Sequence, residues 1–179
     1  MSEAIRVTSA RTEELNADTR AAIIDVCRTT HQEDDFVHLF SYIPSGGIHV
    51  LAYCEQALVS HAVATTRWLQ SEGLPLLRTA YVDAVATLPA YQGRGIGSTV
   101  MRHLASVISE YEIACLETER MSFYAQIGWE AWRGALAGRK ASELVPTPDQ
   151  KGIMILRLER TPLLDLDGLL MVEYDGRMW

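Results

Sequence analysis

A glycine-rich turn between a strand-like segment and a helix-like segment is the part of the sequence best suited to chemistry. The turn follows the apolar segment 77–87 and reads Gln92-Gly93-Arg94-Gly95-Ile96-Gly97-Ser98. A helix that begins there presents unbonded backbone N–H groups and the positive end of its dipole, and both attract anions. The glycines let a ligand approach the backbone closely, and Arg94 adds positive charge. The turn therefore predicts a site for a phosphate or a pyrophosphate.

Two other phosphate motifs share this glycine-rich character but do not match. The dinucleotide fingerprint requires a third glycine three residues after Gly95, where Ser98 stands. The P-loop requires Gly-Lys followed by Ser or Thr, and this turn contains no lysine. What remains is a Gln-x-x-Gly-x-Gly sequence after an apolar strand. The alternative interpretation is a glycine-rich helix entry that binds nothing.

The spacing of apolar residues predicts the elements that position this turn. Ile96, Val100, Leu104 and Ile108 recur at helical spacing and define one apolar face of a helix opened by Gly95. Further helices are expected at 16–27, 35–41 and 122–127. Strands are expected at 5–8, 48–53, 58–69, 77–87, 113–116, 129–133 and 153–158. This order predicts a mixed α/β fold with a mainly antiparallel sheet flanked by helices.

Length and composition limit the class of protein. A chain of 179 residues suits a single domain, 1–179, and segments 134–152 and the tail after Pro162 give no clear secondary structure. Lys and Arg number 16 against 23 Asp and Glu, and the resulting net charge of −7 argues against a nucleic-acid partner. No apolar run approaches the roughly 20 residues that span a bilayer, and the N-terminus resembles no signal peptide. We therefore expect a cytoplasmic protein without a membrane partner.

The cysteines and histidines give no sign of a metal site. The three cysteines have no paired spacing and are expected to be buried free thiols, Cys27, Cys54 and Cys115. The five histidines show neither the H-x-x-x-H pattern nor a neighbouring cysteine pair, so no metal is expected. Trp129 and Trp132 are interpreted as core residues. The apolar tail suggests a homodimer.

The turn 92–98 resembles the acyl-CoA pyrophosphate motif of the Gcn5-related N-acetyltransferases (GNAT). A second stretch, 122–129, resembles that family's closing motif, a tyrosine followed by glycine and an aromatic residue. The resemblance implies the GNAT acetyltransferase fold, with acetyl-CoA as co-substrate. It implies that the strand Val85-Ala86-Thr87 contacts the pantetheine arm. It also implies that the pyrophosphate is held by Gln92, Gly93, Arg94, Gly95, Ile96, Gly97 and Ser98.

The aminoglycoside 2′-N-acetyltransferases are a closer resemblance, which extends over nearly the whole chain. The residues that carry it are Asp35-Phe36, Gly46-Gly47-Ile48-His49, Tyr81-Val82-Asp83, Gly128-Trp129, Trp132 and Trp179. Their order and spacing, rather than any one of them, are typical of that family. The resemblance implies acetylation of an aminoglycoside at a 2′-amino group, and hence antibiotic resistance. The family usually has Glu where this chain has Asp83.

The same resemblance suggests catalytic roles for two residues. An ammonium has no lone pair, so a base must remove a proton before the amine can attack the thioester. Asp83 is the candidate base, and its short side chain favours relay through a water. Tyr124 is the candidate acid for the departing thiolate, and an N–H around Val85 is expected to hold the thioester oxygen. The alternatives are a strand-end carboxylate paired with an arginine and a tyrosine that only packs.

The acceptor side is where the chain departs from the family. Phe40 stands in place of an acid, and Arg177 stands in place of an Asp two residues before Trp179. Fewer acids suggest an acceptor with an anionic group, and kasugamycin, an aminoglycoside with a carboxylate, is the leading acceptor. The predicted acceptor-binding residues are Asp35, Phe40, Asp83, Asp149, Arg177 and Trp179. Solvated acids at 34–35 and an exposed arginine that contacts nothing are the alternatives.

Two other functions remain open at this point. One is acetylation of another small amine or of a protein N-terminus. The other is a non-catalytic domain that only binds acyl-CoA.

Overall fold

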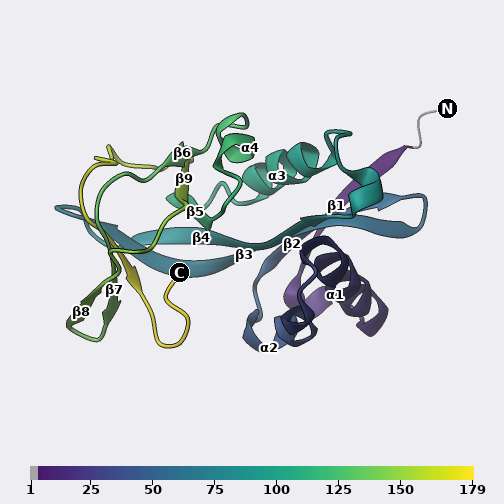
Figure 1. The fold of residues 1–179 in the computed structure, drawn as a ribbon, viewed down its shortest axis with the longest axis horizontal. Helices are drawn as coiled ribbons and strands as arrows, with labels where there is room; N and C mark the ends of the chain where they lie inside the picture. The colour runs from purple at the N-terminus through teal and green to yellow at the C-terminus, as the bar shows by residue number, and fades with distance from the viewer. Residues whose placement is uncertain (1–3) are drawn as a thin grey trace. The chain divides into compact units, whose positions relative to one another are not determined.

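A computed structural model describes residues 4–179 and groups them into two compact units (Figure 1). The first unit comprises the residues up to Thr65 together with Val82–Ile108. The second comprises Thr66–Tyr81 and Ser109–Trp179. Strands β3 (Ala57–Ser71) and β4 (Leu77–Thr87) contribute residues to both units.

The first unit contains a sheet in the order β1-β2-β3-β4, in which β1 and β3 both pair antiparallel with β2. β1 covers Ile5–Arg11 and β2 covers Ile48–Cys54. β2 and β3 form an antiparallel hairpin with its turn at residues 55–56, where Glu55 has a φ of 54°. The strand expected at 77–87 is confirmed with the same bounds as β4.

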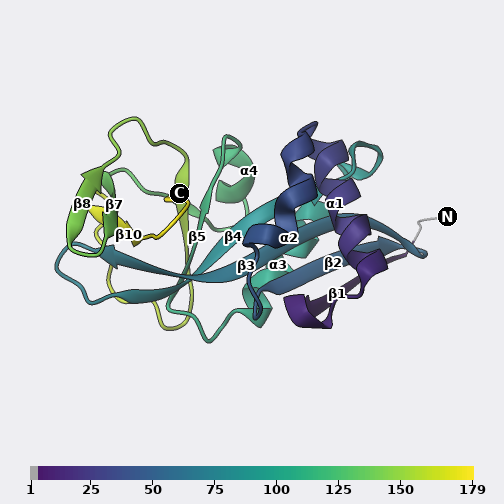
Figure 2. The same cartoon turned by 90° about the horizontal axis from the view of Figure 1, so that it is seen from below.

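Helices cover both faces of this sheet. In Figures 1 and 2, α1 (Ala17–His31) and α2 (Leu39–Tyr42) lie on one face, and α3 (Ile96–Val107) lies on the other. Asn16 caps α1 by accepting a hydrogen bond from the Thr19 backbone at 2.8 Å. The apolar face predicted for α3 is buried as expected. The described residues of this unit also form short 3-10 helices at Thr12–Glu14, Asp34–His38 and Pro89–Tyr91.

The second unit has a mixed sheet in the order β6-β9-β5-β4-β3-β10-β7-β8. Among the described strands, β4–β5 and β10–β7 pair in parallel, whereas β1–β2, β2–β3, β3–β10, β5–β9, β6–β9 and β7–β8 pair antiparallel, which confirms the mainly antiparallel sheet predicted from the sequence. The single helix among its described residues is α4 (Met121–Ala125). The strands first seen here are β5 (Ile113–Glu117), β6 (Glu130–Ala131), β7 (Leu136–Lys140), β8 (Glu143–Pro146), β9 (Ile153–Arg157) and β10 (Leu170–Glu173).

Both segments that gave no clear secondary structure contain strands. Segment 134–152 forms the β7–β8 hairpin, and the tail after Pro162 forms β10. β10 lies between β3 and β7, so both of its edges are paired within the chain. The strand expected at 129–133 is reduced to the two residues of β6.

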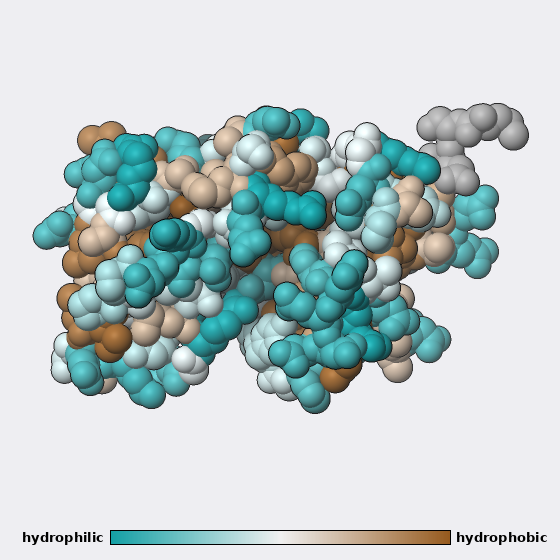
Figure 3. Space-filling model, viewed as in Figure 1, coloured by the Kyte–Doolittle hydropathy of each residue, from teal (hydrophilic) through white to brown (hydrophobic). Residues whose placement is uncertain are grey.

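Each unit has its own apolar core. In the first unit, α1 and α2 contribute Ile23, Cys27 and Leu39 to a cluster with residues of the sheet. In the second unit, Trp132 and Trp179 are buried among strand residues. The three cysteines, all among the described residues, are buried and form no disulfide, and Trp129 is also buried, as predicted. Figure 3 shows mostly hydrophilic side chains on the outer surface of α1 and α2. Among residues 4–179, no helix is long and apolar enough to span a membrane.

Candidate active site

The end of β4 leads directly into the glycine-rich turn. The short 3-10 helix at 89–91 links them, and the Gln92 side chain reaches back to donate to the Thr87 carbonyl at 2.8 Å. The turn itself is exposed from Gln92 to Gly95. Gln92 therefore fixes the turn relative to the strand that precedes it.

Two glycines of the turn adopt a backbone conformation that other residues rarely adopt. Gly93 has a φ of 72° and Gly95 has a φ of 77°. A Cβ atom added at either position would meet nothing within 4 Å. Glycine is therefore required at positions 93 and 95 by the positive φ of the backbone and not by close packing. Gly95 caps the twelve-residue helix α3, whose first N–H groups are available to an anion.

Four consecutive carbonyls of β4 accept hydrogen bonds from side chains. The donors to residues 84, 85, 86 and 87 are, in order, His61 at 2.8 Å, His31 at 3.0 Å, Ser60 at 2.8 Å and Gln92 at 2.8 Å. Because the register between β4 and β5 covers only Thr79–Tyr81, residues 82–87 form the edge of the first unit's sheet. Side chains thus bind this segment in addition to the neighbouring strand β3.

Ala84 interrupts the regular strand geometry beside the candidate base. Its φ of 49° lies in the left-handed region, which is uncommon for a residue with a side chain. Such conformations cost energy and cluster at functional sites. Asp83, immediately before it, is half-buried. The carbonyl of Ala84 also lies 3.8 Å from the Cys27 thiol of α1.

A pair of buried histidines supports this irregular residue. His49 and His61 are both 0% exposed, and their facing ring nitrogens are 2.9 Å apart. Burial lowers the pKa of His61 to about 4. Burial, with the neighbouring His61 and Arg20 as smaller causes, lowers the pKa of His49 to about 3. Both rings are therefore neutral at pH 7.

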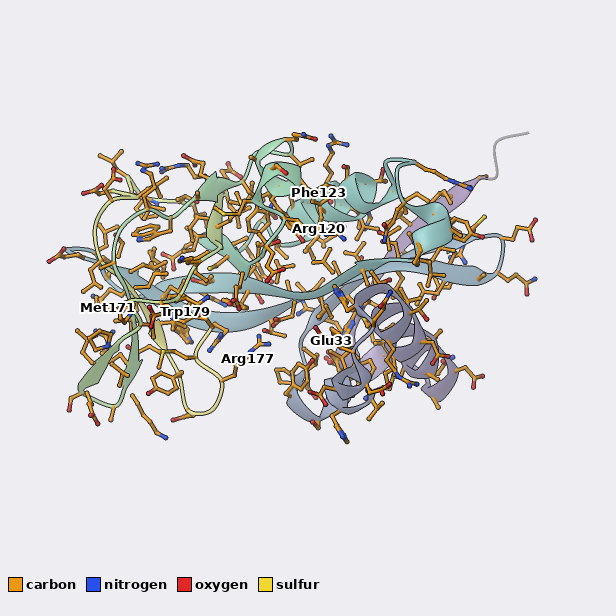
Figure 4. The ribbon with its side chains drawn as sticks, in the orientation of Figure 1. Glu33, Arg120, Phe123, Met171, Arg177 and Trp179 are labelled. Carbon is orange, nitrogen blue, oxygen red and sulfur yellow. The ribbon has the colours of Figure 1, made fainter. Side chains whose placement is uncertain are left out.

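Tyr124 lies on α4 in the second unit. It is 7% exposed, and its ring makes edge contacts with Phe123 at 4.9 Å and Trp129 at 5.8 Å between centroids. Burial raises the pKa of Tyr124 to about 12, partly offset by Arg120. The hydroxyl is therefore protonated throughout the neutral range. Arg120 and Phe123 of the same segment are labelled in Figure 4.

Arg177 does not extend alone into solvent. Its guanidinium carbon lies 5.9 Å from the ring centroid of Tyr81, and Arg67 lies 4.6 Å from the same ring. The Arg67 side chain also donates to the Arg177 carbonyl at 2.6 Å. Arg177 and Trp179 both belong to the segment after β10 (Figure 4). The second unit thus gathers two guanidinium groups at one tyrosine.

The other predicted acceptor-binding residues occupy varied environments. Asp35 is exposed in the 3-10 helix at 34–38, and Asp149 is exposed in the loop after β8. Phe40 stacks on His49 with the ring centroids 5.8 Å apart, and the Arg20 guanidinium carbon lies 4.8 Å from the centroid of the Phe40 ring. Trp179 is buried, and its indole N–H donates to Thr147 at 3.2 Å.

The two units divide the predicted site residues between them. The first holds Asp35, Phe40, Asp83, the strand 85–87 and the turn 92–98. The second holds Tyr124, Asp149, Arg177 and Trp179.

Several side chains at the site were missed in the sequence. Ser60, His61 and Arg67 all come from β3, which sequence patterning identified only as a strand. Their one available signal was the run of polar residues in an otherwise apolar strand, since a buried polar side chain needs a partner.

The sequence profile described as "Acetyltransferase (GNAT) domain" matches residues 10–132, which include β4, the turn and α3. The chain belongs to the GNAT acetyltransferase family. It is an N-acetyltransferase with the GNAT fold, as the resemblance implied. A relative from Mycolicibacterium fortuitum, described as an aminoglycoside 2′-N-acetyltransferase, is 25% identical over 174 residues. That match covers 95% of this GNAT chain and 86% of the relative.

Solved structures share the fold at low sequence identity. The GNAT family N-acetyltransferase YhbS from Escherichia coli, solved in complex with CoA, has a TM-score of 0.67 at 15% identity. The similarity covers 98% of this chain and 93% of YhbS. Eis1 from Mycobacterium abscessus has a TM-score of 0.62 at 17% identity, over 75% of this chain. This chain spans about a third of Eis1, 32% of its length.

Proposed function

We propose that residues 1–179 act as one domain that uses acetyl-CoA to acetylate a 2′-amino group of an aminoglycoside. Kasugamycin is the leading acceptor, and the proposed reaction confers resistance to the antibiotic. The observation that carries the acceptor class is the match to the aminoglycoside 2′-N-acetyltransferase over 95% of the chain. The position of the acetylated amine and the identity of the acceptor go beyond that match. We also propose that the protein works in the cytoplasm and assembles as a homodimer.

Use of acetyl-CoA is supported by the geometry around α3. The positive φ angles of Gly93 and Gly95 leave an open, exposed turn at the N-terminus of a twelve-residue helix. A pyrophosphate there would accept hydrogen bonds from backbone N–H groups, with the charge of Arg94 close by in the turn. Residues 85–87 would contact the pantetheine arm. YhbS, with the same fold, binds CoA.

The proposed chemistry is direct transfer. Asp83, through a water, removes a proton from the acceptor ammonium, and the freed amine attacks the thioester carbonyl. The Val85 N–H stabilises the negative charge that develops on the carbonyl oxygen. The C–S bond then breaks, the nitrogen releases its remaining extra proton to solvent, and Tyr124 donates to the departing thiolate either a hydrogen bond or its proton, which solvent replaces. The products are the N-acetylated acceptor and CoA.

Recognition of an anionic group is supported by the two guanidinium groups at Tyr81. A guanidinium can bind a carboxylate through two parallel hydrogen bonds. It is always charged, and it can stack on an aromatic ring at the same time. Arg177 is exposed, and Arg67 is half-buried. Asp35 and Asp149, both exposed, are the proposed partners of acceptor amines.

The decisive experiment is thiol release from acetyl-CoA in the presence of kasugamycin, gentamicin, small amines and N-terminal peptides. Turnover with kasugamycin, and a product acetylated at the 2′-amine by NMR, supports the proposal. Turnover only with small amines or peptides contradicts the acceptor class. Tight CoA binding without any turnover would instead fit an acyl-CoA-binding domain.

The pyrophosphate assignment predicts the effect of a side chain at Gly97. Gly97→Leu places a bulky group in the first turn of α3, where it would block the phosphate approach. We expect the KM for acetyl-CoA to rise about tenfold or more, the scale of one lost hydrogen bond to a charged group. Arg102→Leu, on an exposed position of the same helix, is the control. An acetyl-CoA KM unchanged in Gly97→Leu would refute the assignment.

The acceptor assignment predicts the effect of removing Arg177. A well-formed guanidinium–carboxylate pair contributes about 1.5–3 kcal/mol, so Arg177→Ala should raise the KM for kasugamycin roughly ten- to a hundred-fold. The KM for acetyl-CoA should not change. Arg177→Asp should weaken kasugamycin binding further and improve acceptance of gentamicin, which is fully cationic. If neither variant changes the KM for kasugamycin, the proposed exchange of acids for an arginine is wrong.

A further inference from the structure

The histidine pair in the first unit follows from the register of two neighbouring strands. In the β2–β3 ladder, His49 faces Val63 and Leu51 faces His61, so the two histidines are diagonal neighbours on one face of the sheet. Their ring centroids are 5.2 Å apart. The Thr12 hydroxyl lies 3.0 Å from the far nitrogen of His49. Thr12, His49 and His61 thus form a buried chain that ends at the Ala84 carbonyl.

The hydrogen-bonding capacity of each group determines which atom donates and which accepts in this series. A carbonyl only accepts, so Nδ1 of His61 carries the proton that is donated to Ala84 at 2.8 Å. In a neutral ring Nε2 of His61 then accepts, and Nδ1 of His49 is the donor at 2.9 Å. Nε2 of His49 is then an acceptor, and it faces the Thr12 hydroxyl at 3.0 Å, a shorter contact than the 3.4 Å from that hydroxyl to the Gly47 carbonyl. Each ring has one tautomer compatible with all three bonds.

The hydrogen bond from His61 to the Ala84 carbonyl determines which way the Val85 N–H points. In a trans peptide, the carbonyl of one residue and the N–H of the following residue point in opposite directions. No peptide bond among the described residues is cis. Because the Ala84 carbonyl points at His61, the Val85 N–H points away from the buried histidines. The left-handed φ of Ala84 gives this peptide an orientation that the regular strand does not have.

We infer that His61, held in one tautomer by His49, is a positioning residue that aims the Val85 N–H at the thioester oxygen. The inference rests on the proposed function, which assigns that N–H to the thioester. His61 itself touches neither acceptor nor acetyl-CoA in this scheme. Removing its N–H takes away the shorter side-chain contact of the Ala84 carbonyl and leaves the Cys27 thiol at 3.8 Å, so the peptide between Ala84 and Val85 is held less firmly.

The test compares two substitutions of His61. His61→Leu removes the donor and keeps an apolar side chain, whereas His61→Asn places an amide N–H near the position of Nδ1. We expect kcat of His61→Leu to fall about 10- to 100-fold, because a misplaced oxyanion donor loses most of its effect. The KM for acetyl-CoA should stay within about threefold, since transition-state contacts alone are lost. His61→Asn should recover most of the turnover.

The control separates orientation from loss of stability. Val63→Ala removes buried volume two residues further along β3, in the same core, without touching the Ala84 carbonyl. It should lower the melting temperature and leave kcat near the wild-type value. The assay uses whichever amine the wild-type chain acetylates fastest, so the inference does not depend on kasugamycin.

A second readout reports on the peptide directly. In a chain labelled with ¹⁵N-valine, the Val85 amide resonance, assigned by its loss in Val85→Ile, should shift in His61→Leu and return in His61→Asn. An unmoved Val85 resonance in His61→Leu overturns the inference whatever happens to kcat. Equal losses of kcat in His61→Leu, His61→Asn and Val63→Ala would also overturn it, because they would report general destabilisation.

Two further outcomes keep the inference distinct from the proposed function. If the wild-type chain acetylates none of the amines, the proposed function fails, and the Val85 resonance alone decides whether His61 orients this peptide. If His61→Leu does not fold, His49→Leu replaces it. That variant removes the ring that fixes the tautomer of His61, and a smaller shift of Val85 in the same direction is expected.

Discussion

Tyr124→Phe is expected to lower kcat about 100-fold or more, the scale of general acid catalysis, while the KM for acetyl-CoA changes little. The substitution keeps the ring that packs on Phe123 and Trp129 and removes only the hydroxyl. The pKa of Tyr124, raised by burial to about 12, lies above the ordinary thiol value of about 8.5. The hydroxyl is therefore expected to act mainly by hydrogen bonding to the thiolate as charge develops on it. Steady-state kinetics at saturating acceptor measure the loss.

A second buried tyrosine of the same unit supplies the control. Tyr111 is 1% exposed, and its hydroxyl lies 2.8 Å from Thr66. Tyr111→Phe should lower the thermal stability by removing that hydrogen bond and leave kcat close to wild type. If Tyr124→Phe, correctly folded, turns over at the wild-type rate, Tyr124 is a packing residue and the departing thiolate is stabilised by another group.

Asp83→Asn is expected to reduce kcat by about 100-fold, because an amide cannot accept the proton that the attacking amine must lose. The change is nearly isosteric, so the strand should keep its conformation. Asp83→Glu retains a carboxylate of the type usual in the resembled family and should keep most of the activity. The pair of variants therefore separates the charge and basicity of the side chain from its length.

Asp25→Asn provides the reference for loss of one carboxylate from the same unit. Asp25 is exposed on α1 and has no role in the proposed chemistry. Its substitution should leave kcat and both KM values unchanged. Wild-type kcat in Asp83→Asn would show that the proton leaves by another route, and Asp83 would then be a strand-end carboxylate.

Local pattern was sufficient to predict the elements around the turn. The helical spacing from Ile96 to Ile108 placed one face of α3 in the core, and burial of those residues confirms it. The segment 77–87 was predicted as a strand because it is long, mostly apolar and ended by Pro89. These features lie in consecutive residues, and hydrophobic periodicity reports on them directly.

The short strands of the second unit depend on partners that are distant in the chain. β10 has four residues and pairs with β3 and with β7, each more than thirty residues away. A strand of that length has no periodicity to detect, so its tertiary partners decide its structure. The strand predicted at 129–133 was too long for the same reason, because β6 has only two residues and depends on its pairing with β9.

The support behind the candidate site could not be predicted from the sequence either. The contact of His49 with His61 requires the β2–β3 register, and the φ of Ala84 is set by the side chains that bind its carbonyl. The spacing of histidines along the chain does not indicate that His49 and His61 meet across a pair of strands.

The place of β10 in the sheet has a consequence for synthesis on the ribosome. The first unit uses no residue after Ile108, so its core can form while later residues are still being translated. In the second unit, β3 and β7 stay unjoined until residues 170–173 have been added between them. The β3 edge is therefore open from early in translation and the β7 edge from residue 140, both until residue 173 has been added, and such edges pair readily with those of other nascent chains. Aggregation during synthesis should thus depend more on the second unit than on the first.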